Sequence, residues 1–321
     1  MPLLENSDFH PPLWLRNPHI QTIYAGLIRP LPEVAYQRER WETPDGDFLD
    51  LDWSRVGGRQ LVLVLHGLEG SADRPYSRGI VRVMNEAGWD GLGLNFRGCS
   101  GEINRLARAY HSGETEDVRW GLRILFAAGS YSRIALGGCR LGAHVTLKYL
   151  GEEGSGLASE IVAGVAISVP VDLESCSHEL SRWYNYPYLL RFLRSLKAST
   201  LEKRALLPEH IDLDAVLSAR DFKEFDDVAT APLHGFKNAV DYWTQSSSKP
   251  FLADIRIPTL ILNAADDTFL SAACYPREIA RRSTFVHLEV PKWGGHVGFV
   301  HFDASRHYWS EQRVCRFLRE H

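Results

Sequence analysis

The chain has 321 residues, which is enough to bury the core of one large domain. Its formal net charge is −4, with acidic and basic residues mixed along the chain, and this argues against a basic nucleic-acid-binding surface. No apolar run approaches the roughly 18 residues of a membrane span, residues 1–6 lack the layout of a signal peptide, and the five cysteines lack zinc or disulfide spacing, so we expect a cytoplasmic protein with free thiols.

Residues 1–33 are rich in proline and aromatic side chains and show no regular period, so we expect an irregular arm on the domain. Residues 34–54 contain two strand-like stretches on either side of Pro44-Asp45-Gly46-Asp47, and an Asp-Gly pair in this setting predicts a β-hairpin. A continuous aliphatic run at residues 60–65 then ends in His66-Gly67, which is typical of a buried parallel strand followed by a loop at its carboxyl end.

The same unit of strand and helix then repeats along the chain. The patterns predict further strands at residues 90–95, 133–137, 161–169, 257–263 and 284–290, and helices at residues 76–87, 115–128, 141–150 and 308–319. Strands and helices that alternate in this way predict an α/β fold, with a mostly parallel central sheet covered by helices on both faces.

The alternation stops between residues 171 and 248, where the sequence is helical, aromatic and charged. Because open α/β sheets bind ligands outside the carboxyl ends of their strands, we interpret this segment as a helical cap over the site, with a packing subdomain as the alternative. The chain is thus expected to form a single domain, with an arm at 1–33, a core at 34–170 and 249–321, and the cap at 171–248.

Gly138-Cys139-Arg140-Leu141-Gly142 lies between a predicted strand and a predicted helix. This is the setting of a nucleophile elbow, whose pattern is Gly-x-Ser-x-Gly. Arg140 stands where that pattern has serine, and it cannot act as a nucleophile because its guanidinium stays protonated. Cys139 breaks the glycine spacing if it is taken as the nucleophile, and we interpret it as a small buried core residue.

Candidates for the acid and the base follow the last two predicted strands. Asp267 comes after residues 257–263, with Asp266 as its rival, and His296 follows the final strand in a glycine-rich loop. The order of elbow, aspartate and histidine is the order in which the α/β-hydrolase fold carries its catalytic triad. Each residue alone would be weak evidence for a catalytic site, but their positions at successive strand ends indicate one site.

The backbone N–H groups of Leu68 and Leu141 are the expected donors of an oxyanion hole. The histidines form no metal-binding motif, and the loop at residues 98–101 lacks a dinucleotide fingerprint and a phosphate-loop lysine. We therefore predict no metal, no nucleotide and no other cofactor, and a small-molecule ligand rather than a nucleic acid.

Several motifs, spread over nearly the whole chain, resemble those of the YheT-like group of the α/β-hydrolase superfamily. They are Asn17-Pro18-His19-Ile20-Gln21-Thr22, Pro44-Asp45-Gly46-Asp47-Phe48, His66-Gly67-Leu68-Glu69-Gly70-Ser71, Asn95-Phe96-Arg97-Gly98-Cys99-Ser100-Gly101-Glu102, Tyr110-His111-Ser112-Gly113-Glu114-Thr115-Glu116-Asp117, Glu224-Phe225-Asp226-Asp227, His234-Gly235-Phe236 and Gly294-Gly295-His296-Val297-Gly298-Phe299. The resemblance implies a serine hydrolase of carboxylic esters, acting on acyl esters of small alcohols or lipids, with its acid at Asp267 and its base at His296.

Arg140 is the departure from this group, because it occupies the position of the nucleophilic serine. Three hypotheses follow: an esterase whose activity is lost or altered, a non-catalytic pseudoenzyme that binds an acyl or carboxylate ligand, or an artefact in the sequence of a working esterase. Because a buried cation requires a partner, Arg140 is expected to lie against Asp267 or a bound anion and to displace His296.

Overall fold

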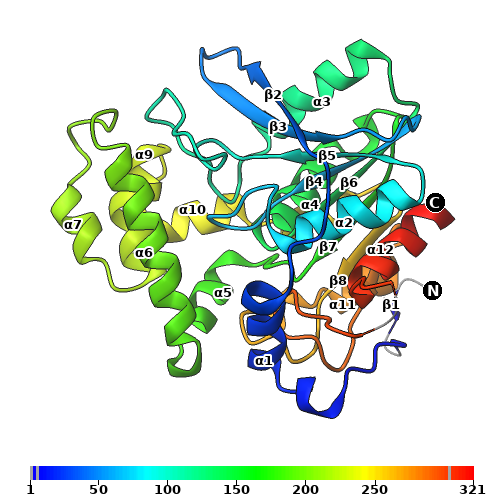
Figure 1. The fold of residues 1–321 in the computed structure, drawn as a ribbon. Helices are drawn as coiled ribbons and strands as arrows, with labels where there is room; N and C mark the ends of the chain where they lie inside the picture. The colour runs from blue at the N-terminus through cyan, green and yellow to red at the C-terminus, as the bar shows by residue number, and fades with distance from the viewer. Residues whose placement is uncertain (1–2, 5–6, 303–304) are drawn as a thin grey trace.

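A computed structural model describes residues 3–4, 7–302 and 305–321 of the chain, and Figure 1 shows a twisted central sheet with helices on both faces. The sheet has the strand order β1-β9-β8-β7-β6-β4-β5-β3-β2. Its strands are β1 (Leu3–Leu4), β2 (Gln37–Glu42), β3 (Phe48–Ser54), β4 (Gln60–Leu65), β5 (Asp90–Leu94), β6 (Arg133–Cys139), β7 (Ile161–Ile167), β8 (Thr259–Leu262) and β9 (Val286–Glu289).

The pairing of the strands confirms the predicted α/β architecture. β2 and β3 form the antiparallel hairpin around the Asp-Gly turn, and Gly46 has the positive φ of 82° that such a turn requires. β3 also pairs antiparallel with β5, whereas the remaining pairs from β5 to β1 are parallel. The carboxyl ends of the parallel strands therefore meet at one edge, where the loops that follow β4, β6, β8 and β9 come together.

Two apolar cores cover the two faces of the sheet. Along β4, Leu61, Leu63 and Leu65 pack into one core, while Val62 and Val64 pack into the other. A strand that is buried on both faces needs apolar side chains at consecutive positions, which explains the continuous aliphatic run in the sequence.

The helices are α1 (Pro18–Ile23), α2 (Pro75–Glu86), α3 (Glu116–Ala128), α4 (Leu141–Glu153), α5 (Leu173–Leu180), α6 (Tyr186–Glu202), α7 (Leu213–Ser218), α8 (Phe222–Phe225), α9 (Ala231–Leu233), α10 (Ala239–Ser246), α11 (Arg277–Arg282) and α12 (Trp309–Glu320). None of the helices within the described ranges is long and apolar enough to cross a membrane.

The arm at residues 1–33 is more regular than the sequence predicts. Leu3–Leu4 forms a short parallel strand beside β9, and α1 continues into a π-helical turn at Tyr24–Ile28. The signals for α1 are local, because the side chain of Asn17 caps the helix and Pro18 takes its first position. Residues 1–2 and 5–6 of this arm lie outside the described part of the chain.

Six helices, α5 to α10, stand between β7 and β8, and Figure 1 shows them on one side of the sheet. They share an apolar cluster of their own, whose largest buried members include Leu189, Leu193, Phe225, Tyr242 and Trp243. This cluster, separate from the two cores of the sheet, makes α5–α10 a packed layer that adjoins the sheet at the edge where the candidate site lies.

Candidate active site

The elbow is a sharp turn between β6 and α4. Arg140 adopts φ 59° and ψ −121°, a conformation that costs free energy for a residue with a side chain. A Cβ added at Gly142 would lie 2.2 Å from the carbonyl oxygen of Leu65, and one added at Gly138 would lie 2.4 Å from the carbonyl carbon of Gly142. Only glycine fits either position, so the backbone of a nucleophile elbow is complete although its central side chain is arginine.

The side chain of Arg140 extends over the loop that follows β4. A Cβ at Gly67 would lie 2.9 Å from Arg140 Cδ, and Arg140 Cζ lies 5.5 Å from the centroid of the Tyr76 ring. Within the described part of the chain the guanidinium forms no ion pair or hydrogen bond, and its Nε is buried without an acceptor. Burial lowers the pKa of Arg140, and Tyr76, Cys139 and Asp267 oppose that shift. Since arginine remains protonated in proteins, this is a partly buried cation that lacks an anionic partner among the described residues.

His296 and Asp267 meet just beyond β9 and β8. His296 Nδ1 lies 2.9 Å from Asp267 Oδ2 and 3.1 Å from Oδ1, and Phe269 stacks on the imidazole with 4.2 Å between ring centroids. Asp266 instead accepts a hydrogen bond of 2.9 Å from the amide of Gly295. The structure therefore brings Asp267, rather than its rival Asp266, to His296.

Burial dominates the electrostatics of His296. Desolvation lowers the pKa of His296, the Arg140 cation lowers it further, and the Asp267 carboxylate opposes both. The imidazole is therefore neutral at pH 7, and Asp267 favours the tautomer with the proton on Nδ1. Nε2 has no hydrogen-bond partner among the described residues, and the ring lines a cavity that Arg140 and Leu141 also line. A neutral imidazole with a free Nε2 is able to accept a proton at that atom.

Arg140 does not displace His296, so the expectation of an Arg140–Asp267 ion pair is wrong. The Asp267 carboxylate is held by His296 and also accepts a hydrogen bond of 3.0 Å from the amide of Phe269. The Arg140 side chain leaves the apex in another direction, because Gly67 has no Cβ and leaves room for it to pass. The histidine and the aspartate thus stay paired beside an unpaired cation.

Two backbone amides complete the site. Leu141 begins α4, so its N–H is one of the donors that a helix leaves unpaired at its N-terminus. Leu68 lies in the loop after β4 and lines the same cavity. Among the described residues no protein acceptor bonds to either amide. Together with the dipole of α4, these donors favour negative charge next to Arg140.

The cavity beside these groups has a volume of about 220 Å³ and is enclosed by the edge of the sheet and by the helices α5 to α10. Arg140, Leu141 and His296 are at its base. Most other lining side chains are apolar, and several of them come from those helices, among them Leu180, Phe192, Leu196, Phe222 and Leu233. An apolar chamber over a few polar groups suits a ligand with an acyl chain and a polar head.

Glu69 joins the loop after β4 to α6, a role that the sequence does not reveal. Its carboxylate accepts hydrogen bonds from Tyr110 Oη at 2.7 Å, Ser195 Oγ at 3.0 Å and Ser199 Oγ at 2.6 Å. Glu69 also has a positive φ of 51°. These contacts hold Leu68, the preceding residue of the loop, against the helices that line the cavity.

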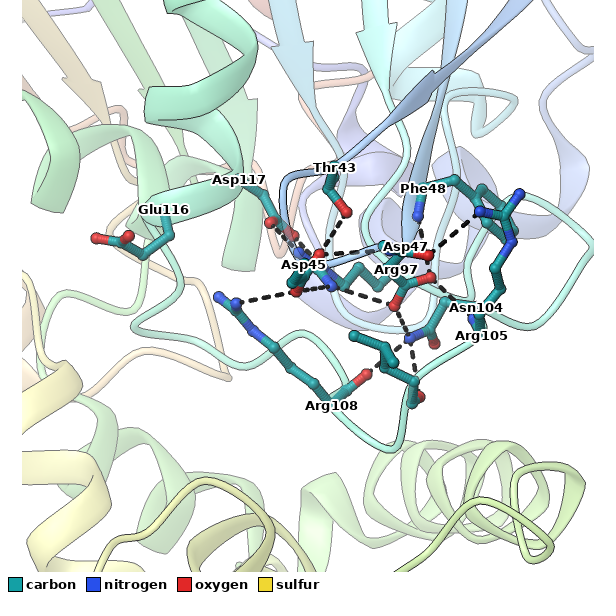
Figure 2. A network of polar contacts seen from close by, with 12 residues as sticks. Thr43, Asp45, Asp47, Phe48, Arg97, Asn104, Arg105, Arg108, Glu116 and Asp117 are labelled. Atoms are coloured by element: carbon teal, nitrogen blue, oxygen red, sulfur yellow. Dashed lines mark hydrogen bonds and ion pairs between the residues drawn. The ribbon is translucent and has the colours of Figure 1, made fainter.

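Figure 2 shows Arg97 among carboxylates of the hairpin turn and of α3. Its guanidinium donates two hydrogen bonds of 2.8 and 2.7 Å to Asp117, and it lies 2.8 Å from Asp45 Oδ2 and 3.1 Å from Asp47 Oδ2. Burial alone would raise the pKa of Asp45, but hydrogen bonds from Thr43 and Arg97 lower it to about 2. The motifs that contain these residues are far apart in the sequence and meet here.

Lys203, directly after α6, reaches the loop that follows Arg97. Its Nζ donates hydrogen bonds of 2.9, 2.9 and 2.8 Å to Asn104 Oδ1 and to the carbonyl oxygens of Ala107 and Arg108. Asn104 in turn donates to Asp47 Oδ2 at 2.6 Å. Burial lowers the pKa of Lys203 to about 8. Polar contacts therefore connect the end of α6 to the loop at residues 104–108, and this loop to the turn of the β2–β3 hairpin.

The described residues contain no group of three histidine, cysteine, aspartate or glutamate side chains placed to hold a metal ion. Cys139 is fully buried in one of the two cores, and burial raises the pKa of its thiol to about 12. A thiol in that state is not a nucleophile at neutral pH. The elbow and the loops around it thus bring together a neutral histidine, two free amides and an arginine without an ion pair.

This fold and this site define a protein of the hydrolase class, and comparison with known proteins agrees. A family model described as alpha/beta hydrolase fold matches residues 60–301. The protein YheT of Escherichia coli (strain K12), whose name assigns it to the esterases, is 38% identical over 98% of this chain and 93% of its own length. Phospholipase ABHD3 of Mus musculus is 30% identical over 92% of this chain and 74% of its own.

A solved esterase, Pf2001 of Pyrococcus furiosus, shares the fold with a TM-score of 0.59 at 20% identity, over 91% of this chain and 96% of its own. The chain therefore belongs to the α/β-hydrolase family and, within it, to the YheT-like group.

Proposed function

We propose that the cavity is an acyl-ester site of the carboxylic ester hydrolase type, in which Arg140 has replaced covalent catalysis with recognition of a carboxylate. The observation that carries this proposal is the partly buried Arg140 guanidinium, whose Nε is buried without an acceptor and which has no ion pair among the described residues. Partial burial of a charge without a partner costs free energy, and a carboxylate bound there would accept hydrogen bonds from the guanidinium. The apolar lining above would hold the acyl chain of the same ligand.

The covalent route needs a nucleophile that this chain lacks. In a serine hydrolase the apex hydroxyl attacks the ester carbonyl, the histidine takes its proton, and the oxyanion hole stabilises the tetrahedral intermediate. Here His296 would supply the base and Leu68 and Leu141 the amides, but Arg140 offers no attacking oxygen. Loss of the nucleophile alone lowers kcat by about 10⁶-fold in a triad enzyme.

A second candidate function is hydrolysis by a water molecule that His296 activates directly. The neutral imidazole, its contact of 2.9 Å with Asp267 and its free Nε2 favour this candidate. In such a reaction Arg140 would stabilise the negative charge that develops on the ester oxygen.

The names of the relatives support a lipid-like ligand, because they include a phospholipase and, in Saccharomyces cerevisiae, a monoacylglycerol lipase. All five cysteines are free, which favours a reducing compartment such as the cytoplasm. Acyl chains attached to small alcohols, or the fatty acids released from them, are therefore the ligands to test first.

Calorimetric titration with decanoate tests the carboxylate proposal, with decanol as the matched ligand that lacks the charge. We expect decanoate to bind and decanol to bind more weakly. Arg140→Met, which keeps the bulk of the side chain, should weaken decanoate by roughly 10- to 100-fold, the range expected when a charge-assisted hydrogen bond is lost. Equal binding of decanoate and decanol, or unchanged binding to Arg140→Met, would contradict the proposal.

Hydrolysis of p-nitrophenyl butyrate distinguishes the two candidates. If the site only binds, the unmodified protein is inactive and Arg140→Ser gains activity that depends on His296. If water is activated directly, the unmodified protein shows slow turnover that His296→Ala removes. Turnover that survives His296→Ala would mean that the reaction occurs at another site.

A further inference from the structure

Large apolar side chains are exposed mainly in one region of the described chain. Fourteen such side chains are exposed, and eleven of them belong to residues 13–31, to residues 183–190 or to Phe302. Trp183 is 85% exposed, Leu13 76% and Leu27 64%. Exposed apolar groups that are scattered singly need no explanation, but a cluster of this kind marks an interaction surface.

The two segments lie side by side. His19 Nδ1 lies 3.1 Å from Tyr188 Oη, and the two rings are stacked. Figure 1 shows α1 of the arm close to the lower end of α6. Phe302 extends the cluster, because its ring stacks on that of Trp14 in the arm with 6.1 Å between the centroids. We call residues 13–31, residues 183–194 and Phe302 the docking face.

The charge of the docking face has one sign. Residues 13–31 and 183–194 contain no aspartate and no glutamate, whereas they contain Arg16, Arg29, Arg191 and Arg194, and Arg182 and Lys197 lie just beyond the second range. Arg29 is paired with Glu311, and Arg182 lies 3.2 Å from Glu179.

Arg191 and Arg194 are exposed and form no ion pair with any described residue. They lie within one turn of each other on α6, next to the exposed Leu190. The docking face thus combines apolar and aromatic side chains with cations that have no partner in the protein.

A cavity of about 430 Å³ opens between the arm and α6. Ile23 and Leu27 line it from the arm, and Arg191 and Arg194 line it from α6. Arg140, at the elbow, lines the same cavity. A ligand that enters from the docking face would therefore come directly to the candidate site.

We propose that the docking face binds the surface of a bilayer that contains anionic phospholipids, with its apolar side chains in the interfacial layer and Arg191 and Arg194 at the headgroups. Apolar and aromatic groups bordered by arginines suit this interface. A second copy of the chain is a poor occupant, because facing copies would bring like charges together. The proposal concerns only where the protein binds, and it holds whether or not the site at Arg140 hydrolyses esters.

Co-sedimentation with vesicles tests the proposal on the full chain. We expect binding to vesicles of phosphatidylcholine mixed with phosphatidylglycerol, and much weaker binding to phosphatidylcholine alone. Added salt should weaken the binding, because it screens the exposed arginines. Brominated lipid should quench the tryptophan fluorescence, and Trp183→Phe should reduce the quenched fraction.

Variants on and off the docking face provide the matched comparison. Each arginine near an anionic surface contributes about 1 kcal/mol, so Arg191→Gln with Arg194→Gln should weaken binding by roughly 30-fold. Arg123 is an exposed arginine of α3 without an ion pair in the described chain, and Arg123→Gln should not weaken binding. Leu27→Ser should weaken binding, whereas Val56→Ser, at a side chain that is 51% exposed elsewhere, should leave it unchanged.

Several results would overturn the proposal. They are absence of binding to either vesicle, equal binding to both, equal effects of docking-face and control variants, or concentration-dependent self-association that Leu27→Ser abolishes. Ester hydrolysis is not a readout in this experiment, so failure of the proposed function would leave its outcome unchanged.

Discussion

Arg97 provides a test of how the loop over the site is held. The Arg97 side chain is 2% exposed, and the side chains of Asp47 and Asp117 are 0% and 4% exposed. Arg97→Met would leave these carboxylates buried without their counter-charge, which costs about 3–5 kcal/mol when one partner of a buried pair is removed. For 321 residues the unfolding entropy is roughly 0.7 kcal/mol/K, so the melting temperature should fall by about 4–7 °C.

Calorimetric melts at several pH values measure this effect. The pKa of Asp45 is held at about 2 in the folded chain, below its ordinary value of 3.8, so its contribution is present above pH 4 and is lost as the pH falls toward 2. The difference between the unmodified protein and Arg97→Met should therefore be full at pH 7 and should narrow in acid. Arg281→Met removes an exposed ion pair with Glu278 and should change the melting temperature little. Equal shifts in the two variants, or a difference that grows in acid, would refute the reasoning.

Three further outcomes follow from the structure. Gly142→Ala should yield little folded protein on expression, because its Cβ would lie 2.2 Å from a carbonyl oxygen of β4, whereas Gly156→Ala meets nothing within 4 Å and should fold normally. Lys203→Met leaves one buried and two part-buried acceptors without their donor and should lower the unfolding free energy in urea by about 3 kcal/mol, while Lys223→Met, at an exposed pair, should change it little. Burial raises the pKa of Asp226 to about 7, so the folded protein binds a proton there that the unfolded chain has lost above about pH 4. The stability from this proton is lost as the pH rises from about 4 to about 7. Over this interval the melting temperature of Asp226→Asn should therefore fall less than that of the unmodified protein.

The sequence predicts the sheet well because the strands β3 to β9 are buried on both faces. β4 agrees with the aliphatic run at residues 60–65, and the elbow has the two glycines that its close packing requires. The arm was harder to predict, since α1 has only six residues and no amphipathic period, although Asn17 and Pro18 mark its start. α11 is equally short and was not predicted.

The sequence also places the candidate residues at the ends of the right strands, but it does not specify their contacts. The direction of the Arg140 side chain depends on space at Gly67, which only the three-dimensional packing reveals. The roles of Glu69 and Lys203 rest on partners that are 41 to 130 residues away, and no local pattern indicates such contacts.

The central claim is that the elbow, His296 and the two amides form an esterase site that lacks only its nucleophile. Mass spectrometry after exposure to a fluorophosphonate, which phosphonylates activated serines, tests it most directly. The account predicts that Arg140→Ser gains one adduct at residue 140, that Arg140→Ser combined with His296→Ala does not, and that the unmodified protein stays unlabelled. An Arg140→Ser variant that folds but remains unlabelled, or a labelled unmodified protein, would contradict the account.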